Sequence, residues 1–337
     1  MAKPTYFRIA FLIFTLAAPS IFAAPPKIGV FIPGVREGSP IYDNLAKGVE
    51  RYAATVPGTV VRIFEAGFNQ AEWEEKLTSF TATGNFDLVI TSNPSLPSLI
   101  NRLAPLFPRQ KFINFDAFGA GNPNLHTVLY NQTEQGYVIG YLAGLVTVSD
   151  MAGANSAKRV GMLIGQRYPV MDRLIIPGFE RGLKAADPAI QLDVRVLGNW
   201  YDATKAAELT KSMIDAGADV ILPICGSASQ GAIKAAQDAG KYLVFFDSDE
   251  YHRAPKTILA CIALHQEELA FSSLNEAFKP GFPYGTARIV GIKEGYIELL
   301  DRHPSYQQGL PAQIRAKVAA AIEEIKNGRL RFPVPTL

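Results

Sequence analysis

The sequence predicts an α/β protein made of two lobes, each an open, doubly wound parallel sheet. Three observations lead to this prediction. From Lys27 onward, short apolar runs alternate with stretches of helical periodicity, which is typical of parallel sheets covered by helices on both faces. The apolar runs are nearly continuous, as expected for strands buried on both sides. The alternation also falls into two similar blocks, at residues 27–131 and 159–262.

Strands are expected where Val, Ile, Leu and Phe gather in short runs. In chain order these are residues 27–32, 59–64, 86–91, 111–116, 159–164, 192–197, 218–225, 242–247, 257–262 and 287–292. Helices are expected where apolar residues recur every three or four positions. These are residues 42–53, 70–82, 95–106, 134–148, 170–186, 203–216 and 229–239. Asp202 stands directly before one of these helices and is the expected N-cap.

Residues 1–23 have the composition of a secretory signal peptide. Lys3 and Arg8 precede a short apolar run, and the small residue Ala23 marks the expected cleavage site. The run is too short to cross a bilayer, which makes a membrane anchor the weaker interpretation. No cysteine lies near the cleavage site, so a lipid attachment is not expected. The mature protein is therefore expected to be exported to the periplasm.

Composition narrows the class of protein further. The 337 residues include 33 Lys and Arg against 31 Asp and Glu, a net charge of +2. This balance gives no strong electrostatic field that would attract nucleic acid, so no nucleic-acid partner is expected. The protein is also expected to be a monomer. Cys225 and Cys261 lie in apolar stretches and are expected to be buried small residues, although an exported protein could also form a disulfide.

Signals for enzymatic chemistry are weak. The sequence has no phosphate-binding G-x-x-x-x-G-K-[ST] motif, no G-x-G-x-x-G after its first strand and no G-x-S-x-G nucleophile turn. Its four histidines are scattered without the spacing of metal ligands. The acidic turn at residues 247–250 could serve acid–base chemistry or Ca²⁺, but a solvated loop or a hydroxyl acceptor is the preferred interpretation. No catalytic residue, metal or cofactor is expected.

Aromatic and polar residues follow the expected strands. Ligands of open α/β sheets bind just beyond the carboxyl ends of the strands, and two such lobes would share a cleft there. Tyr42, Tyr168 and Trp200 stand at these ends and suit a flat ligand, because stacking adds to the burial of area. Asp116 and Asp247 supply acceptors for hydroxyl groups. Trp73 lies inside a helical pattern, so its expected role is packing.

The chain resembles the basic-membrane-protein family of substrate-binding proteins for ABC transporters, which includes purine nucleoside receptors. Three stretches carry the resemblance, namely residues 107–117, 198–250 and 286–300. The resemblance implies a non-enzymatic receptor with a type I periplasmic-binding fold, whose lobes are joined by three crossovers near 131–133, 262–265 and 284–292. It also implies a first lobe of residues 25–131 plus 264–284 and a second of residues 132–263 plus 285–337.

Within the family, the chain most closely resembles the riboflavin-binding receptors. "PGVREGSPIY", "YNQTEQGY" and "GNWYDA" are among the features that carry this resemblance. Purine nucleoside receptors have an Asp-Asp-Lys-Ser-Phe-Asn run after the first strand, and this chain instead has "REGSPIY". The family's cleft lysine aligns near His265. The resemblance retains an aromatic at Trp200 and a carboxylate at Asp249, which in the family faces ribose hydroxyls. Both suit a flavin with its ribityl chain.

The expected function is therefore binding of riboflavin and its delivery to a membrane permease. The flavin ring is expected to stack on Trp200 with Tyr42 or Tyr168 opposite. A purine nucleoside receptor, a nucleoside-processing α/β enzyme acting at 247–250 and a receptor that signals without a transporter are the alternatives. The candidate ligand-binding residues are Ser39, Tyr42, Asn93, Asp116, Asn131, Gln132, Tyr168, Trp200, Asp247, Asp249 and Gln266.

Overall fold

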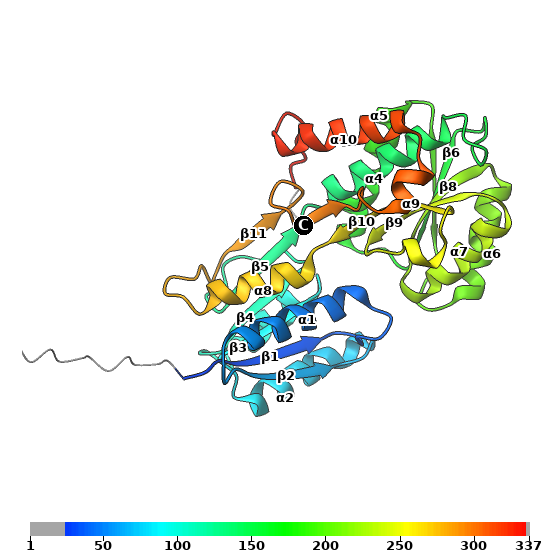
Figure 1. Ribbon diagram of the computed structural model, residues 1–337. Helices are drawn as coiled ribbons and strands as arrows, with labels where there is room; N and C mark the ends of the chain where they lie inside the picture. The colour runs from blue at the N-terminus through cyan, green and yellow to red at the C-terminus, as the bar shows by residue number, and fades with distance from the viewer. Residues whose placement is uncertain (1–23, 335–337) are drawn as a thin grey trace, which may run out of the picture.

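The computed structural model describes residues 24–334 of the chain and shows two lobes (Figure 1). Each lobe contains a six-stranded sheet with helices on both faces. The first sheet has the order β11-β5-β4-β3-β1-β2 and is entirely parallel. The second has the order β12-β10-β9-β8-β6-β7, with only β12 antiparallel. The α/β fold class and its two parallel sheets are confirmed. The expected signal peptide lies outside the described residues.

The first lobe takes most of its chain from the amino-terminal third. Its strands are β1 (Lys27–Ile32), β2 (Val60–Glu65), β3 (Leu88–Ser92), β4 (Lys111–Phe115), β5 (Leu125–Tyr130) and β11 (Ala287–Val290). Its helices are α1 (Pro40–Thr55), α2 (Trp73–Gly84), α3 (Leu96–Leu103) and α8 (Gln266–Ala277), with a short 3-10 turn η1 (Gln70–Glu72) before α2. Helices α1 and α8 pack side by side on one face of the sheet, and α2 and α3 cover the other.

The second lobe repeats this plan. Its strands are β6 (Arg159–Ile164), β7 (Gln191–Val196), β8 (Ala218–Ile224), β9 (Tyr242–Asp247), β10 (Ile258–Leu264) and β12 (Ile297–Leu299). Its helices are α4 (Gln132–Thr147), α5 (Ile176–Ala186), α6 (Ala203–Asp215), α7 (Ser229–Asp238), α9 (Pro304–Gly309) and α10 (Ala312–Lys326). The short elements are the π-helical turn η2 (Met171–Ile175) and the 3-10 turns η3 (Gly226–Ala228) and η4 (Tyr251–Arg253). Asp202 caps α6 as predicted, accepting from the Lys205 amide at 2.9 Å.

The third crossover lies within the expected range 284–292, but the boundary between the lobes lies later than residue 284. Residues 285–290 were assigned to the second lobe, but β11 pairs in parallel with β5 of the first sheet. The ladder continues past the strand, because the Asn131 amide donates to the Val290 carbonyl at 2.7 Å. The chain therefore crosses to the second lobe after Val290, and the first sheet gains its sixth strand.

Strand burial follows the continuous apolar runs. Every residue of β3, β5 and β10 is buried, and one apolar cluster extends through both lobes. Trp73 is 3 % exposed in a second cluster beneath the first sheet, so its predicted packing role is confirmed. Its indole N–H donates to the Gly67 carbonyl at 2.8 Å. Cys225 and Cys261 are both buried and unpaired, as expected.

The carboxyl-terminal segment is tied to the first crossover. The Asn131 side-chain amide donates to the Phe332 carbonyl at 2.9 Å. The Phe332 ring is buried against Tyr137 of α4, with ring centroids 4.8 Å apart, and the Arg181 guanidinium lies 4.4 Å from the centre of the Phe332 ring. These contacts fasten the end of the described chain to α4 and α5, beside the point where the chain leaves the first lobe.

Helices α4 and α5 pack backbone against backbone. Gly136, Gly140 and Gly144 lie along α4, and Gly178 and Gly182 lie on α5. A Cβ atom at Gly140 would stand 2.3 Å from the Phe179 carbonyl oxygen, and one at Gly182 would stand 2.2 Å from a main-chain oxygen of α4. Such distances are shorter than real carbon–oxygen contacts, so only glycine allows the two helices to approach this closely.

We predict that Gly140→Ala destabilises the ligand-free protein by about 1–3 kcal/mol, because the added methyl group must push the two helices apart. The free energy of unfolding in urea measures this effect. Gly309→Ala is the matched control, since its Cβ would meet only a leucine methyl at 3.3 Å. The control should be neutral or slightly stabilising. A neutral Gly140→Ala would contradict the close packing of α4 and α5.

Candidate ligand-binding site between the lobes

The lobes are connected at three places that lie close together at one edge of each sheet. The chain crosses between β5 and α4, between β10 and α8, and between β11 and β12. From the opposite edge toward these crossovers, the first sheet runs β2-β1-β3-β4-β5-β11 and the second runs β7-β6-β8-β9-β10-β12. Strand β1 thus corresponds to β6, β2 to β7 and β4 to β9. Loops after these strands carry the candidate residues.

Tyr42 and Asn93 form the first-lobe part of the site. Tyr42 lies in the first turn of α1, where its ring packs over Gly34, and its hydroxyl accepts from the Asn93 side-chain amide at 3.3 Å. Asn93 is held in turn by Asn114, whose side chain accepts from the Asn93 amide and donates to its carbonyl, both at 3.0 Å. Ser39 precedes α1 and is half-buried, but its side chain makes no capping hydrogen bond.

Two aspartates occupy equivalent places in the two lobes. Asp116 follows β4 and Asp247 ends β9, and both have a positive φ, at 54° and 70°. This left-handed backbone is uncommon outside glycine and is tolerated best by Asn and Asp. Asp247 accepts from the Gln135 side-chain amide at 3.0 Å. The Oδ1 atom of Asp116 is buried and has no hydrogen-bond partner among the described residues.

The two carboxyl groups lie close enough to influence each other. Burial, and secondly the charge of Asp247, raise the pKa of Asp116 to about 8. Burial raises the pKa of Asp247 to about 6, opposed by the hydrogen bond from Gln135. Neither shift involves a lysine or an arginine. The two carboxyl groups therefore favour a bound proton or a ligand that donates hydrogen bonds, and they disfavour a ligand group with a negative charge.

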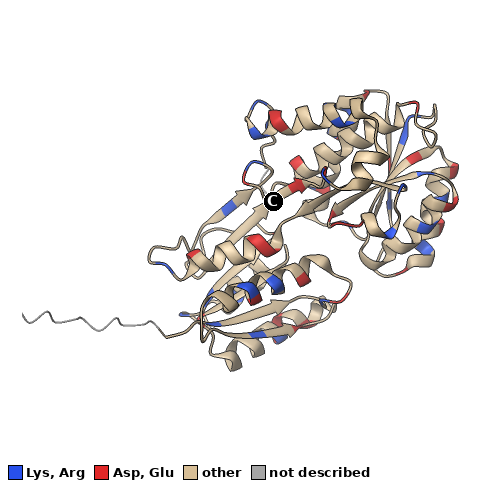
Figure 2. Ribbon diagram, viewed as in Figure 1, with Lys and Arg blue, Asp and Glu red and all other residues tan. Residues whose placement is uncertain are grey.

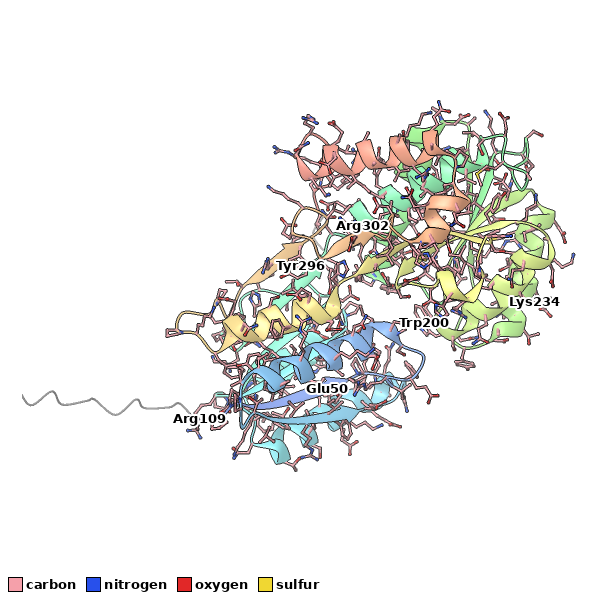
Figure 3. All side chains as sticks on the ribbon, viewed as in Figure 1. Glu50, Arg109, Trp200, Lys234, Tyr296 and Arg302 are labelled. Atoms are coloured by element: carbon pink, nitrogen blue, oxygen red, sulfur yellow. The ribbon has the colours of Figure 1, made fainter. Side chains whose placement is uncertain are left out.

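Tyr168 and Trp200 form the second-lobe wall of the site. Their ring centroids are 6.4 Å apart at an interplanar angle of 48°. Burial raises the pKa of Tyr168 well above its ordinary value, and the charges of Asp116, Asp247 and Tyr42 contribute. Tyr168 therefore faces groups from both lobes. Figure 3 shows Trp200 at the edge of the second lobe that faces α1 of the first.

The arrangement of the two rings restricts how a ligand can stack. A flat ligand between two parallel rings needs them about 7 Å apart, twice the contact distance of about 3.5 Å. Tyr168 and Trp200 are closer than this and tilted, so they form one continuous wall rather than two faces of a slot. Of the two tyrosines that the sequence offered as the opposite face, only Tyr42 comes from the other lobe.

Side-chain amides concentrate at the crossovers. Gln266 is fully buried, accepts from the Tyr130 hydroxyl at 3.0 Å and donates to the Ile41 carbonyl at 3.0 Å. Both ends of this side chain therefore hold the crossover together, as does the Asn131 amide through Phe332. Gln132 is also buried, and its carbonyl oxygen lacks a partner among the described residues.

The structure brings some of the candidate ligand-binding residues together between the lobes and leaves others apart. The structure brings together Tyr42, Asn93, Asp116, Tyr168, Trp200 and Asp247, which we call the inter-lobe site. Asp249, two residues after Asp247, is exposed, and its carboxylate accepts from the Tyr251 amide at 3.2 Å, so its place in the site stays a prediction. The sequence analysis missed Gln135, which donates to Asp247 and has a buried carbonyl oxygen without a partner among the described residues. Its position one turn after Gln132 in the same helix could have revealed it.

Other features of the described residues offer no competing site. A surface hollow of about 600 Å³ lies at the other end of the second sheet. Two of the charged residues that line it, Lys158 and Asp187, already form an ion pair with each other at 2.6 Å. Between residues 24 and 334, no cluster of His, Cys, Asp and Glu could hold a metal ion. Over the same range, no helix has the length and apolar character needed to cross a membrane. Basic and acidic residues are interspersed on both lobes (Figure 2).

We predict that Asp116→Asn flattens the pH dependence of stability. The folded protein holds the Asp116 proton up to a pH of about 8, whereas the unfolded chain releases it near 3.8. This contribution to stability is complete below pH 3.8 and is lost as the pH rises to about 8. At pH 8 the free energy of unfolding of the variant should therefore exceed that of the wild type by about 1 kcal/mol. This value corresponds to roughly one unit of the pKa shift, because solvent screening removes much of the full effect.

Urea denaturation of the ligand-free protein at pH 5 and pH 8 provides the measurement. Asp249→Asn is the matched control, because Asp249 is exposed and its hydrogen bond survives the change. This control should follow the wild type at both pH values. An Asp116→Asn variant that loses stability with pH as steeply as the wild type would show that Asp116 is not held protonated.

Two similar lobes, joined by three crossovers and facing each other across aromatic and acidic residues, define a solute-binding protein of the type I periplasmic-binding fold. Solved structures share this fold. A solute-binding protein of an ABC transporter system from Aeropyrum pernix has a TM-score of 0.77 at 18 % identity, covering 92 % of this chain and 94 % of that one. The myo-inositol binding protein of Caulobacter has a TM-score of 0.63 at 19 % identity, covering 84 % and 97 %.

The chain belongs to the PnrA-like family of ABC transporter substrate-binding proteins, whose profile matches residues 26–330. Its members are non-enzymatic solute-binding proteins, which sets the enzyme alternative aside. Among relatives, a CD4+ T-cell-stimulating antigen of Listeria monocytogenes is 22 % identical over 281 residues, covering 79 % of this chain and 75 % of the relative. A purine-binding protein of Brucella abortus is 24 % identical over 192 residues, covering 57 % and 51 %.

Proposed function

We propose that the protein is an exported receptor that binds riboflavin between its lobes and delivers it to the permease of an ABC importer. Membership of the family supplies the general role in transport. The proposal of riboflavin as the ligand is carried by one observation, the continuous aromatic wall of Tyr168 and Trp200 facing Tyr42 of the other lobe. A wall of this kind favours a broad, flat ring over a compact sugar, because offset stacking adds to the burial of apolar area.

The polar part of the inter-lobe site supports a neutral, hydroxyl-rich ligand. Asp247 accepts a hydrogen bond from Gln135, and Asp116 has a buried oxygen without a partner among the described residues. No lysine or arginine contributes to the pKa shift of either group. The ribityl chain of riboflavin carries hydroxyl donors and no charge. Binding would replace a costly buried carboxyl group with a hydrogen-bonded one, which is a favourable change in a site shielded from water. Asn93, Gln132 and Gln135 would complete this polar shell.

A purine nucleoside is the alternative ligand, since the Brucella relative is named a purine-binding protein. A purine would also stack on Trp200, and its ribose would also offer hydroxyl groups. The two ligands differ in ring size, because the three fused rings of a flavin cover a larger part of the Tyr168–Trp200 wall. Direct competition between the two ligands therefore distinguishes the proposals.

We predict that riboflavin binds one per chain and that its fluorescence is quenched by stacking. Trp200→Ala should weaken binding about 5- to 150-fold, the effect of losing about 1–3 kcal/mol of ring stacking. Its effect on the free energy of unfolding without ligand should be small, since Trp200 is partly exposed at the lobe edge. Fluorescence titration and urea denaturation of the same samples measure both quantities.

Tyr201→Ala is the matched control for this experiment. Tyr201 is the next residue and is 77 % exposed, so its removal should leave riboflavin affinity unchanged. Tight binding of adenosine or guanosine together with no quenching of riboflavin would replace the proposed ligand by a purine nucleoside. Unchanged affinity in Trp200→Ala with a large loss of stability would make Trp200 a packing residue.

A further inference from the structure

The two lobes build the same turn beside their first strand. After β2, the Ala66 amide donates to the Ile32 carbonyl and the Gly67 amide donates to the Gly34 carbonyl, at 2.8 and 2.9 Å. After β7, the corresponding bonds run from Leu197 to Ile164 and from Gly198 to Gly165, both at 2.8 Å. Both turn glycines have a positive φ, 73° in the first lobe and 92° in the second. The lobes therefore present similar backbone at these strand ends, with one additional residue, Pro33, between the two acceptors of the first lobe.

An aromatic ring lies over the same glycine in each turn. In the second lobe, a Cβ atom at Gly165 would stand 2.6 Å from the indole of Trp200. In the first lobe, a Cβ atom at Gly34 would stand 2.8 Å from the ring of Phe68 and 2.7 Å from the ring of Tyr42. The absence of a side chain on each glycine provides the space for the ring. Phe68 is thus the first-lobe counterpart of Trp200.

Phe68 is exposed on a rigid support. It is 59 % exposed, among the most exposed large apolar side chains of the described residues. Its turn is fixed by the Trp73 indole, which donates to the Gly67 carbonyl, and by Asn69, whose side chain caps the following 3-10 turn. Single exposed apolar side chains are common on protein surfaces, so exposure alone does not mark a site. What distinguishes Phe68 is its place over Gly34 at the end of the strand. The opposing lobe presents Trp200 at the matching position.

The site is also polarised along its length. Phe68 and Trp200 follow β2 and β7, the strands farthest from the crossovers, whereas Asp116 and Asp247 follow β4 and β9, which lie three strands nearer to them. Tyr42 and Tyr168 lie between, since Tyr168 is influenced by both carboxylates and its ring also contacts Trp200. Apolar stacking surface thus dominates the outer end of the site, and hydrogen-bond acceptors dominate the inner end.

We propose that Phe68 is a specificity-determining residue that closes on the ligand's ring opposite Trp200, with the ring at the outer end and the polyol chain pointing inward to Asp116 and Asp247. This inference rests on the proposed function in one respect, that the ligand has a flat ring at one end and hydroxyl groups at the other. It adds Phe68 to Tyr42 on the first-lobe side of the ring, at the outer end of the site. It also fixes the direction in which the ligand lies.

Three probes separate the two ends of the site. Lumiflavin has the ring without the polyol chain, riboflavin has both, and FMN carries a phosphate at the end of the chain. Phe68→Ala should weaken riboflavin and lumiflavin by the same factor, about 5- to 150-fold. Asp116→Asn should weaken riboflavin about tenfold and leave lumiflavin unchanged. FMN should bind the wild type more weakly than riboflavin, because its phosphate would meet the two carboxyl groups.

Two further variants control this test. Phe68→Tyr keeps the ring and should retain most of the affinity. Phe278→Ala removes a partly exposed phenylalanine that stacks on Tyr52 of α1, away from the strand ends, and should leave binding of both flavins unchanged. Urea denaturation of each variant establishes that the protein remains folded. Equal stability of Phe68→Ala and the wild type is expected, since Phe68 is mostly exposed.

The outcomes distinguish this inference from the proposed function. If Trp200→Ala weakens riboflavin but Phe68→Ala does not, the role of Phe68 is overturned and the riboflavin proposal stands. If Asp116→Asn weakens lumiflavin as much as riboflavin, the inward direction of the chain is overturned. If the wild type binds adenosine and no flavin, the riboflavin proposal fails. Phe68→Ala must then weaken adenosine by the same factor, and unchanged adenosine affinity overturns the sandwich.

Discussion

Two half-buried acidic side chains, one from each lobe, influence each other with no lysine or arginine contributing to the pKa shift of either, and the rest of the site depends on this constraint. In a medium of low dielectric, two such groups cannot both be ionised at small cost. The pKa of Asp116 is therefore raised to about 8, whereas the hydrogen bond from Gln135 opposes the rise in the pKa of Asp247. A proton, or a ligand that donates hydrogen bonds to both groups, would lower the cost of holding the two carboxyl groups close together.

The sequence predicted the sheets well where strands are continuous apolar runs. β6 and β9 match the expected ranges at both ends, because neither run is interrupted by a polar residue. β5 was missed because His126 and Thr127 interrupt its run, although both are buried and hydrogen-bonded, Thr127 with the backbone of Gly119 and His126 with that of Pro283. Helices α8, α9 and α10 and the three-residue β12 also escaped prediction, since the periodic pattern weakens after the second block.

The candidate site was predictable to the extent that it depends on strand ends. Asp116, Tyr168 and Trp200 directly follow strands, so the topology alone brings them to one face. Hydrogen bonding could not be predicted in the same way. Both polar atoms of the Gln266 side chain form hydrogen bonds that hold the crossover. Gln135 lies one turn inside a helix and still donates to Asp247. The sequence analysis did not select Phe68, because the position of its ring depends on the lack of a side chain at Gly34, which is distant in the sequence.

The glycine contact between α4 and α5 has a mechanical consequence for the whole molecule. α4 starts at the first crossover and is packed too closely against α5 to slide past it. The two helices would therefore move as one body if one lobe turned against the other. A helix of 16 residues is about 24 Å long, and a turn of about 10° would displace its far end by about 4 Å. A small change of backbone angles at Asn131 would therefore be amplified into a larger displacement at the far end of α4.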